Sequence, residues 1–118
     1  MKLLLFCSLV LFCFSITGKC QSNTTFKDTV KVIFENEKFI VTEYDSVPGN
    51  DVCGIGRHSH KPHLNILLTD ASVKLTKDNE KPQVFNLKEG TAFWSEAETH
   101  MVFNNGKNPI KLYLIEAK

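Results

Sequence analysis

After residue 20, the hydrophobic residues occur in short runs and alternations, and no stretch shows the long 3.6-residue apolar period of an amphipathic helix. Segments rich in Val, Ile, Phe, Tyr and Thr alternate with clusters of Gly, Pro, Asn and Asp, which is typical of strands separated by turns. The predicted strands are 29–34, 38–47, 56–60, 64–69, 72–76, 83–87, 91–94, 101–103 and 110–115. Short strands with turns about every 8–12 residues predict an all-β domain, either a sandwich, a jelly roll or a small barrel.

The first 20 residues follow a different pattern, with 14 hydrophobic residues, three of the four cysteines and only two charges. A charged start, an apolar run shorter than the roughly 20 residues that span a bilayer, and a small polar segment predict a signal peptide cleaved before Gln21. We therefore expect residues 21–118 to form one exported domain, periplasmic or secreted, with no stable membrane span. A buried N-terminal helix and a lipid anchor on Cys20 are less favoured, the latter because Lys19 precedes that cysteine.

Without the signal peptide, the chain has twelve Lys and Arg against thirteen Asp and Glu, a net charge of −1 with histidine uncharged. A nucleic-acid-binding protein normally carries a basic patch, so this balance argues against a nucleic-acid partner. It also argues against a cationic helix that lies on a membrane surface. The one remaining cysteine, Cys53, excludes an internal disulfide framework. We expect Cys53 to be a small buried hydrophobic residue, and a thiol beside a metal site is the alternative.

All four histidines lie in the predicted domain, and three of them fall within six residues. His58 and His60 are two residues apart, so on a strand both side chains point to the same face. A regular strand would place His63 on the opposite face, but a bulge at Pro62 can reset the alternation. His100 lies forty residues from His60, at the start of another predicted strand. Because imidazole is the commonest metal ligand, we predict a metal site here, with incidental surface histidines or a pH-sensitive cluster as alternatives.

The residues around these histidines resemble the two sequence motifs of small single-domain proteins of the cupin superfamily. Residues 56–70 are similar to the first motif, and residues 90–104 are similar to the second. The resemblance covers about residues 40–116 and implies a conical β-barrel, also described as a double-stranded β-helix or jelly roll. The metal ligands that it implies are His58, His60 and His100.

The chain departs from the cupin pattern at several positions. The remaining ligand is usually a glutamate, and His63 stands at the matching position, which implies a four-histidine site. The second motif lacks its usual proline and second glycine, and the interval from Gly90 to His100 is one residue short. The resemblance also implies a homodimer, because cupins often pair through sheet edges.

Four neutral imidazoles leave the +2 charge of a divalent ion uncompensated, which favours an anionic or enediolate-like ligand. An octahedral ion would keep two open positions, enough for oxygenase, isomerase or lyase chemistry on a small oxygenated organic molecule. Four histidines would saturate a tetrahedral zinc ion, which then lacks the open position of a catalytic site. Manganese, iron, nickel, copper and zinc all remain open. The alternative to an enzyme is a non-catalytic module that binds a metal or a small ligand.

Two carboxylates precede His100 and are the candidate catalytic groups. Glu98 and Glu96 could act as a proton shuttle or as hydrogen-bond partners of a ligand, although solvated loop charges are the favoured interpretation. Four hydrophobic residues of the second motif are expected to pack in the core rather than line the cavity. They are Phe93, Trp94, Met101 and Phe103.

Overall fold

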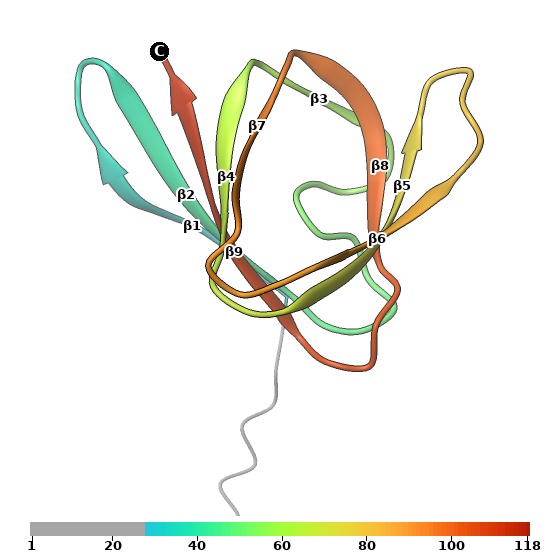
Figure 1. Cartoon of the computed structure of the whole chain (residues 1–118). Coiled ribbons are helices and arrows are strands. Elements are labelled where there is room, and N and C mark those ends of the chain that lie inside the picture. Colours follow the sequence, from blue (N-terminus) through green and yellow to red (C-terminus); the bar gives the residue numbers. More distant parts are fainter. Residues whose placement is uncertain (1–27) are drawn as a thin grey trace, which may run out of the picture.

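The computed structural model describes residues 28–118, and every regular element in this range is a β-strand (Figure 1). The strands are β1 (Thr29–Glu35), β2 (Phe39–Ser46), β3 (His58–His60), β4 (His63–Leu67), β5 (Ala71–Lys77), β6 (Gln83–Leu87), β7 (Ala92–Ser95), β8 (Glu98–Asn104) and β9 (Ile110–Ala117). The all-β prediction is confirmed. Within the same range, no helix is long and apolar enough to cross a membrane. The predicted signal peptide lies outside the described residues.

The strands form two antiparallel sheets that face each other (Figure 1). The five-stranded sheet has the order β1-β2-β9-β4-β7, and the four-stranded sheet has the order β3-β8-β5-β6. β3 and β4 follow each other in sequence but belong to opposite sheets. The connection at Lys61 and Pro62 therefore crosses from one wall of the domain to the other, where the sequence interpretation allowed for a kink or bulge.

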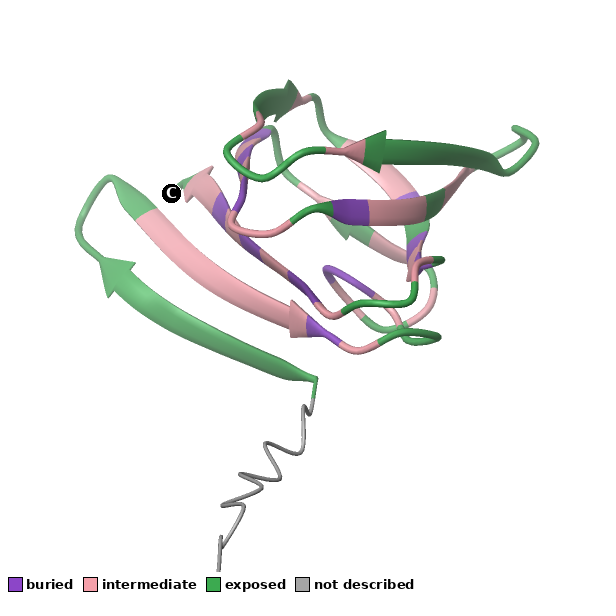
Figure 2. Cartoon of the chain, turned by 60° about the horizontal axis from the view of Figure 1, so that its bottom comes forward, coloured by how far each residue is buried: buried purple, intermediate pink, exposed green. Residues whose placement is uncertain are grey.

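The hydrophobic core lies between the two sheets and is best seen along β9. Ile110, Leu112 and Leu114 alternate with partly exposed neighbours, as expected for a strand with one face turned inward (Figure 2). β9 pairs with β2 on one side and β4 on the other, so these side chains lie at the centre of the larger sheet. Burial of one such aliphatic side chain stabilises the fold by about 1.5–3 kcal/mol.

The inward face of β4 changes from polar to apolar along the strand. His63, Asn65 and Leu67 are buried, whereas Leu64 and Ile66 point to the opposite face and are only half-buried. A buried histidine and a buried amide need hydrogen-bond partners or a ligand, because an unpaired buried polar group is costly. The polar end of β4 therefore marks the part of the interior where recognition of a ligand is possible.

The prediction that Phe93, Trp94 and Met101 pack in the core is wrong. All three are exposed, and Trp94 most of all, at 57%. Phe93 and Trp94 lie on β7, an edge strand with β4 as its one neighbour, so no second strand covers them. Met101 lies between buried neighbours on β8, and strand alternation turns it to the outer face. Phe103 is partly buried.

Candidate metal centre

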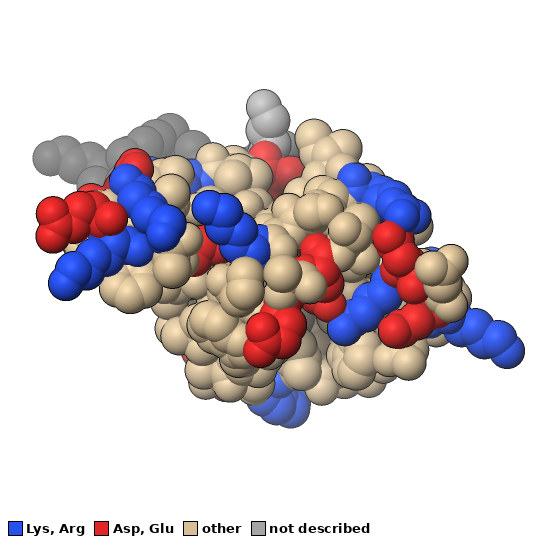
Figure 3. Space-filling model, turned by 90° about the horizontal axis from the view of Figure 1, so that it is seen from above, with Lys and Arg blue, Asp and Glu red and all other residues tan. Residues whose placement is uncertain are grey.

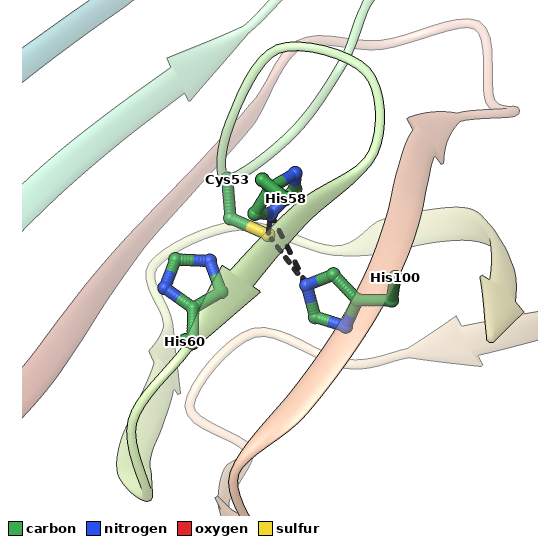
Figure 4. A group of neighbouring side chains, drawn as sticks. All are labelled: Cys53, His58, His60 and His100. Carbon is green, nitrogen blue, oxygen red and sulfur yellow. Dashed lines mark hydrogen bonds between the residues drawn. The ribbon is translucent and has the colours of Figure 1, made fainter. Parts of the chain in front are cut away.

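Three histidines meet because β3 and β8 pair side by side. In the antiparallel register, His58 is directly opposite His100, and His60 lies two residues further along β3 on the same face (Figure 4). The centroid of the His58 ring is 4.8 Å from those of both His60 and His100. The sequence analysis expected His58 and His60 on one strand, His63 across a kink and His100 on a neighbouring strand to converge, and the structure brings three of these four together.

The fourth member of the cluster is Cys53, in the loop between β2 and β3. One potential ligand atom from each of Cys53, His58, His60 and His100 lies within 4.8 Å of the others (Figure 4). A backbone hydrogen bond of 2.9 Å from the Val52 N–H to the Val102 carbonyl fastens this loop onto β8. Cys53 is buried, as expected, but it also lies beside the histidines, which the sequence interpretation treated as the alternative.

Gly54 leaves the room that the His58 ring occupies. A Cβ atom at this position would lie 2.7 Å from two ring carbons of His58, closer than real Cβ contacts come. Any larger residue would have to displace the ring or the loop. The glycine thus allows Cys53 and His58, five residues apart, to place their side chains together.

Each of the three clustered histidines has its Nδ1 atom held by an acceptor. The acceptors are the carbonyl oxygen of Gly56 for His58, Oε1 of Glu116 for His60 and Oε1 of Glu98 for His100, at 2.9, 3.1 and 2.9 Å. Carbonyl and carboxylate oxygens only accept, so Nδ1 carries the proton in each ring. This leaves the three Nε2 atoms as lone-pair donors, the usual arrangement of histidines that bind a metal.

Hydrogen bonds within the cluster can satisfy only one of the three Nε2 atoms at a time. Nε2 of His58 and Nε2 of His100 are 3.2 Å apart, so two lone pairs face each other in the neutral rings. Nε2 of His60 is buried and has no hydrogen-bond partner among the described residues. The Cys53 thiol can donate its one proton to only one acceptor at a time. A cation at this point would satisfy all three nitrogens at once.

The separation of the nitrogens also fits a shared metal ion. Zinc binds imidazole nitrogen at about 2.0–2.1 Å, so a tetrahedral ion places two such nitrogens about 3.3–3.4 Å apart. The observed 3.2 Å between the Nε2 atoms of His58 and His100 is close to this value. These two nitrogens could therefore share a metal ion as they stand, whereas the ligand atoms of the whole cluster spread over up to 4.8 Å and would have to come closer to complete its shell.

Burial favours the neutral form of two histidines of the cluster, His60 and His100. Desolvation is the largest influence on His60 and His100 and lowers the pKa of both below the ordinary 6.5, although Glu116 and Glu98 act in the opposite direction. Neutral imidazole is the form that binds a metal. Desolvation also raises the pKa of the Cys53 thiol to about 12 in the metal-free protein. A bound cation reverses that preference and deprotonates a coordinating thiol.

The two candidate carboxylates have different surroundings. Glu98 is largely buried, accepts the hydrogen bond from His100 and forms a 2.7 Å ion pair with Lys77. Burial alone would raise the pKa of Glu98, but the hydrogen bonds from Lys77 and His100 outweigh it and lower the pKa overall. Glu96 is exposed and accepts a 3.0 Å hydrogen bond from the indole nitrogen of Trp94. The structure thus joins Glu98, but not Glu96, to the histidine cluster.

The predicted four-histidine set is not confirmed, because His63 lies outside the group of converging ligand atoms. Its ring centroid is 5.0 Å from that of His60, but it comes from β4 in the opposite sheet. Nδ1 of His63 donates to the Lys61 carbonyl at 2.6 Å, so its Nε2 is an acceptor in the neutral ring. His63 instead belongs to the wall of the cavity beside the cluster.

That cavity has a volume of about 410 Å³ and extends between the two sheets from the cluster. Its polar lining includes Cys53 and His100 from the cluster, together with His63, Asn65, Ser95, Lys77, Glu96 and Glu98. Nδ2 of Asn65 donates to Ser95 Oγ at 3.1 Å. The remaining lining is apolar, formed by core Val, Leu and Ile residues and by Phe85, Phe93 and Trp94. Such a pocket suits a small molecule with an apolar body and a polar end.

The outer surface carries charges of both signs. Figure 3 shows Lys and Arg side chains interspersed with Asp and Glu on the face seen from above. This distribution agrees with the near-neutral charge of the domain.

Comparison with solved structures identifies the architecture. A cupin domain from Bordetella pertussis Tohama I superposes with a TM-score of 0.68 and 25% identity, over 77% of this chain and 93% of that one. The chain has the cupin fold. An RmlC-like cupin with a double-stranded β-helix from Methanocaldococcus jannaschii matches with a TM-score of 0.64 and 14% identity, over 80% of this chain and 84% of that one.

The cupin fold is also shared with an enzyme, the polyketide cyclase RemF from Streptomyces resistomycificus. The two superpose with a TM-score of 0.59 and 16% identity, over 76% of this chain and 64% of that one. No known family's sequence model matches this chain. No curated protein matches it either. The Methanocaldococcus and Streptomyces structures are only 14% and 16% identical to this chain, so their likeness establishes the fold alone.

Proposed function

We propose that this protein is an exported metal-binding cupin that binds a small oxygenated organic molecule and acts on it at a metal ion. A divalent transition metal held by His58, His60 and His100 would supply Lewis-acid or redox activation of the bound molecule. The cavity beside the cluster provides the space for that molecule. Oxidation is the first reaction class to test, and isomerisation or elimination is the second.

The observation that carries the proposal is the unpaired Nε2 of His60. This atom is buried, and the side chain is only 9% exposed, while its Nδ1 is already engaged by Glu116. An unsatisfied buried polar atom costs about 1–3 kcal/mol, which a metal ion would offset by accepting the lone pair. The two other histidines present their Nε2 atoms at the same place with their own Nδ1 atoms held.

The residues around the cavity define the class of molecule. Nε2 of His63 would accept a hydrogen bond from a hydroxyl group, and the amide of Asn65 would hold a second oxygen atom nearby. Phe85, Phe93 and Trp94 offer apolar area to the rest of the molecule. Glu98 would position His100, and Glu96 at the exposed end of the cavity is the candidate for proton transfer with solvent.

Metal analysis of the purified protein tests the proposal. We expect one transition-metal ion per chain, and loss of that ion in His58→Ala, His60→Ala and His100→Ala. His63→Ala is the matched control, because it removes an imidazole at the same depth without removing a ligand atom of the cluster. Unchanged metal content in the three cluster variants would contradict the site.

One observation favours a second candidate, a binding module without catalysis. The cluster contains four protein groups that could ligate, and four ligands complete the shell of a tetrahedral ion. The two functions differ in whether the metal keeps exchangeable water. Water-proton relaxation with a paramagnetic ion in the site distinguishes them: enhanced relaxation supports the enzyme, and the absence of enhancement supports the binding module.

We also propose that the protein is a homodimer formed through β1. β1 is an edge strand, and all seven of its residues are exposed, including Val30, Val32 and Phe34. Unpaired backbone groups on such an edge are free to pair with another strand.

The proposal of export rests on the predicted signal peptide, and mass analysis of the mature N-terminus in the host tests for cleavage before Gln21.

A further inference from the structure

We infer that Cys53 binds the metal as a thiolate and completes a three-histidine, one-cysteine centre that prefers borderline and soft ions such as Zn²⁺ over hard ions such as Mn²⁺. The inference rests on the proposed metal centre and narrows its range of metals. Four protein ligands complete the shell of a tetrahedral ion, so this centre agrees with the binding module, and an enzyme built on it would need the ion to accept a fifth ligand. It also assigns to Cys53 the place that the resemblance gave to His63.

The position of the sulfur atom supports ligation. Sγ of Cys53 lies 3.4 Å from Nε2 of His58 and 3.6 Å from Nε2 of His100. With zinc–sulfur and zinc–nitrogen distances of about 2.3 and 2.0–2.1 Å, a tetrahedral ion separates the two ligand atoms by about 3.5–3.6 Å. Both observed distances agree with sulfur and nitrogen on one ion, as does the separation of the two nitrogens.

The charge of the buried site favours a thiolate over a fourth imidazole. Three neutral imidazoles and one thiolate leave a divalent ion with a net charge of +1, whereas four imidazoles leave +2. Cys53 is 7% exposed and His100 is 4% exposed, so the charge of the ion is shielded from water on these sides. A smaller net charge costs less to bury.

The loop that carries Cys53 is built to hold it there. The Val52 N–H donates to Val102, two residues from His100 on β8, and the isolated bridge between Asp51 and Phe103 fixes the same stretch. Gly54 has no side chain, so nothing at this position collides with the His58 ring. His63 has no comparable placement, since its ligand atoms lie outside the cluster and it belongs to the opposite sheet.

X-ray absorption spectroscopy of the zinc-loaded full chain tests the inference directly. We expect one sulfur neighbour at about 2.3 Å beside nitrogen at about 2.0–2.1 Å. The sulfur should disappear in Cys53→Ser and remain in His63→Gln, the matched control. A spectrum with nitrogen and oxygen neighbours alone would overturn the inference but leave the metal centre intact, whereas a protein that binds no metal would overturn the proposed function as well.

Metal competition gives a second, independent measurement. Cys53→Ser should reduce the ratio of Zn²⁺ to Mn²⁺ affinity by at least about tenfold. Loss of a group that only hydrogen-bonds to a ligand already lowers metal affinity by about 10–100-fold, and loss of the ligand itself should cost at least as much. An unchanged ratio would contradict thiolate ligation. If the serine variant does not fold, the X-ray absorption spectrum of the zinc-loaded unmodified protein replaces it: a sulfur neighbour supports the inference, and nitrogen and oxygen neighbours alone would overturn it.

Discussion

The side chains of the candidate centre depend on neighbours that do not themselves reach the metal position. Gly54 leaves room for one ring, and Glu98 fixes the orientation of another through Nδ1. Such groups affect metal affinity through the ligand that they place, because an imidazole rotated away from the site cannot direct its lone pair to the ion. Two single substitutions separate these contributions.

Gly54→Ala should weaken metal binding by at least about tenfold, because the new methyl group occupies space that the His58 ring needs. Overpacking of this kind also costs about 1–3 kcal/mol in the free energy of unfolding. Calorimetric zinc titration measures the affinity, and urea unfolding measures the stability. Gly106→Ala, a glycine away from the cluster with a milder 3.3 Å contact to Ser72, is the control and should leave the affinity unchanged. Equal affinities in both variants would contradict the role of Gly54.

Glu98→Gln should lower metal affinity by about 10–100-fold, because the amide accepts the Nδ1 hydrogen bond without the negative charge that strengthens His100 as a ligand. The variant also loses the ion pair with Lys77. Glu96→Gln makes the same chemical change two residues away, at an exposed carboxylate hydrogen-bonded to Trp94, and should bind zinc as the unmodified protein does. If zinc titrations show the same affinity for both variants, Glu98 does not strengthen His100 as a metal ligand.

At the level of strands, alternation of side chains predicted the β-rich fold and the shared face of His58 and His60, since both depend only on local periodicity. It could not predict that β3 and β4 belong to opposite sheets. That separation depends on pairings far apart in sequence, β3 with β8 and β4 with β9. The separation is also what removes His63 from the ligand cluster, which the motif alone could not reveal.

Cys53 and the exposed aromatic residues show a different limit. Cys53 lies in a loop without strand periodicity, and only the attachment of this loop to β8 brings it to His100, 47 residues away. Phe93 and Trp94 have the hydrophobicity of core residues, but β7 is an edge strand and leaves them exposed at the cavity. Hydrophobicity does not reveal whether a strand has one neighbour or two.

The proposed dimer through β1 leads to a prediction about charge. If two copies of β1 pair antiparallel with Ile33 on the twofold axis, Lys31 of each lies opposite Glu35 of the other. Like charges directly opposite each other destabilise a strand pair, so Lys31→Glu and Glu35→Lys should each shift the protein toward monomer. The double variant should restore the dimer, because it recreates opposite charges. Sedimentation velocity measures the assembly.

Two outcomes would count against this pairing. A monomeric unmodified protein would exclude the dimer at the concentrations measured. A double variant that remains as dissociated as the single variants would show that Lys31 and Glu35 do not face each other. Lys88→Glu, on an exposed turn away from β1, is the control for charge reversal and should not change the assembly.

For the whole molecule, the buried histidines link folding to pH. In the metal-free protein, the pKa of His60 and of His100 is lower in the folded state than the ordinary 6.5, mainly because of desolvation. The unfolded chain therefore binds more protons than the folded chain as the pH falls below about 6.5. Stability that is fully present above this value is lost on acidification. Glu116 faces His60 and Glu98 faces His100, and both carboxylates reduce the effect without reversing its sign.

We therefore expect the free energy of unfolding, measured by urea denaturation in the presence of a chelator, to change little between about pH 7.5 and about pH 6.5 and to decrease from there to about pH 5.5. A variant with His60→Gln and His100→Gln removes both groups and should show a flatter dependence over this range, whatever its absolute stability. A flat or rising curve for the unmodified protein would mean that the folded state accepts these protons as readily as the unfolded chain does. In that case histidines of the folded cluster would be protonated at mildly acidic pH. Protons rather than a metal would then occupy the lone pairs of the facing Nε2 atoms.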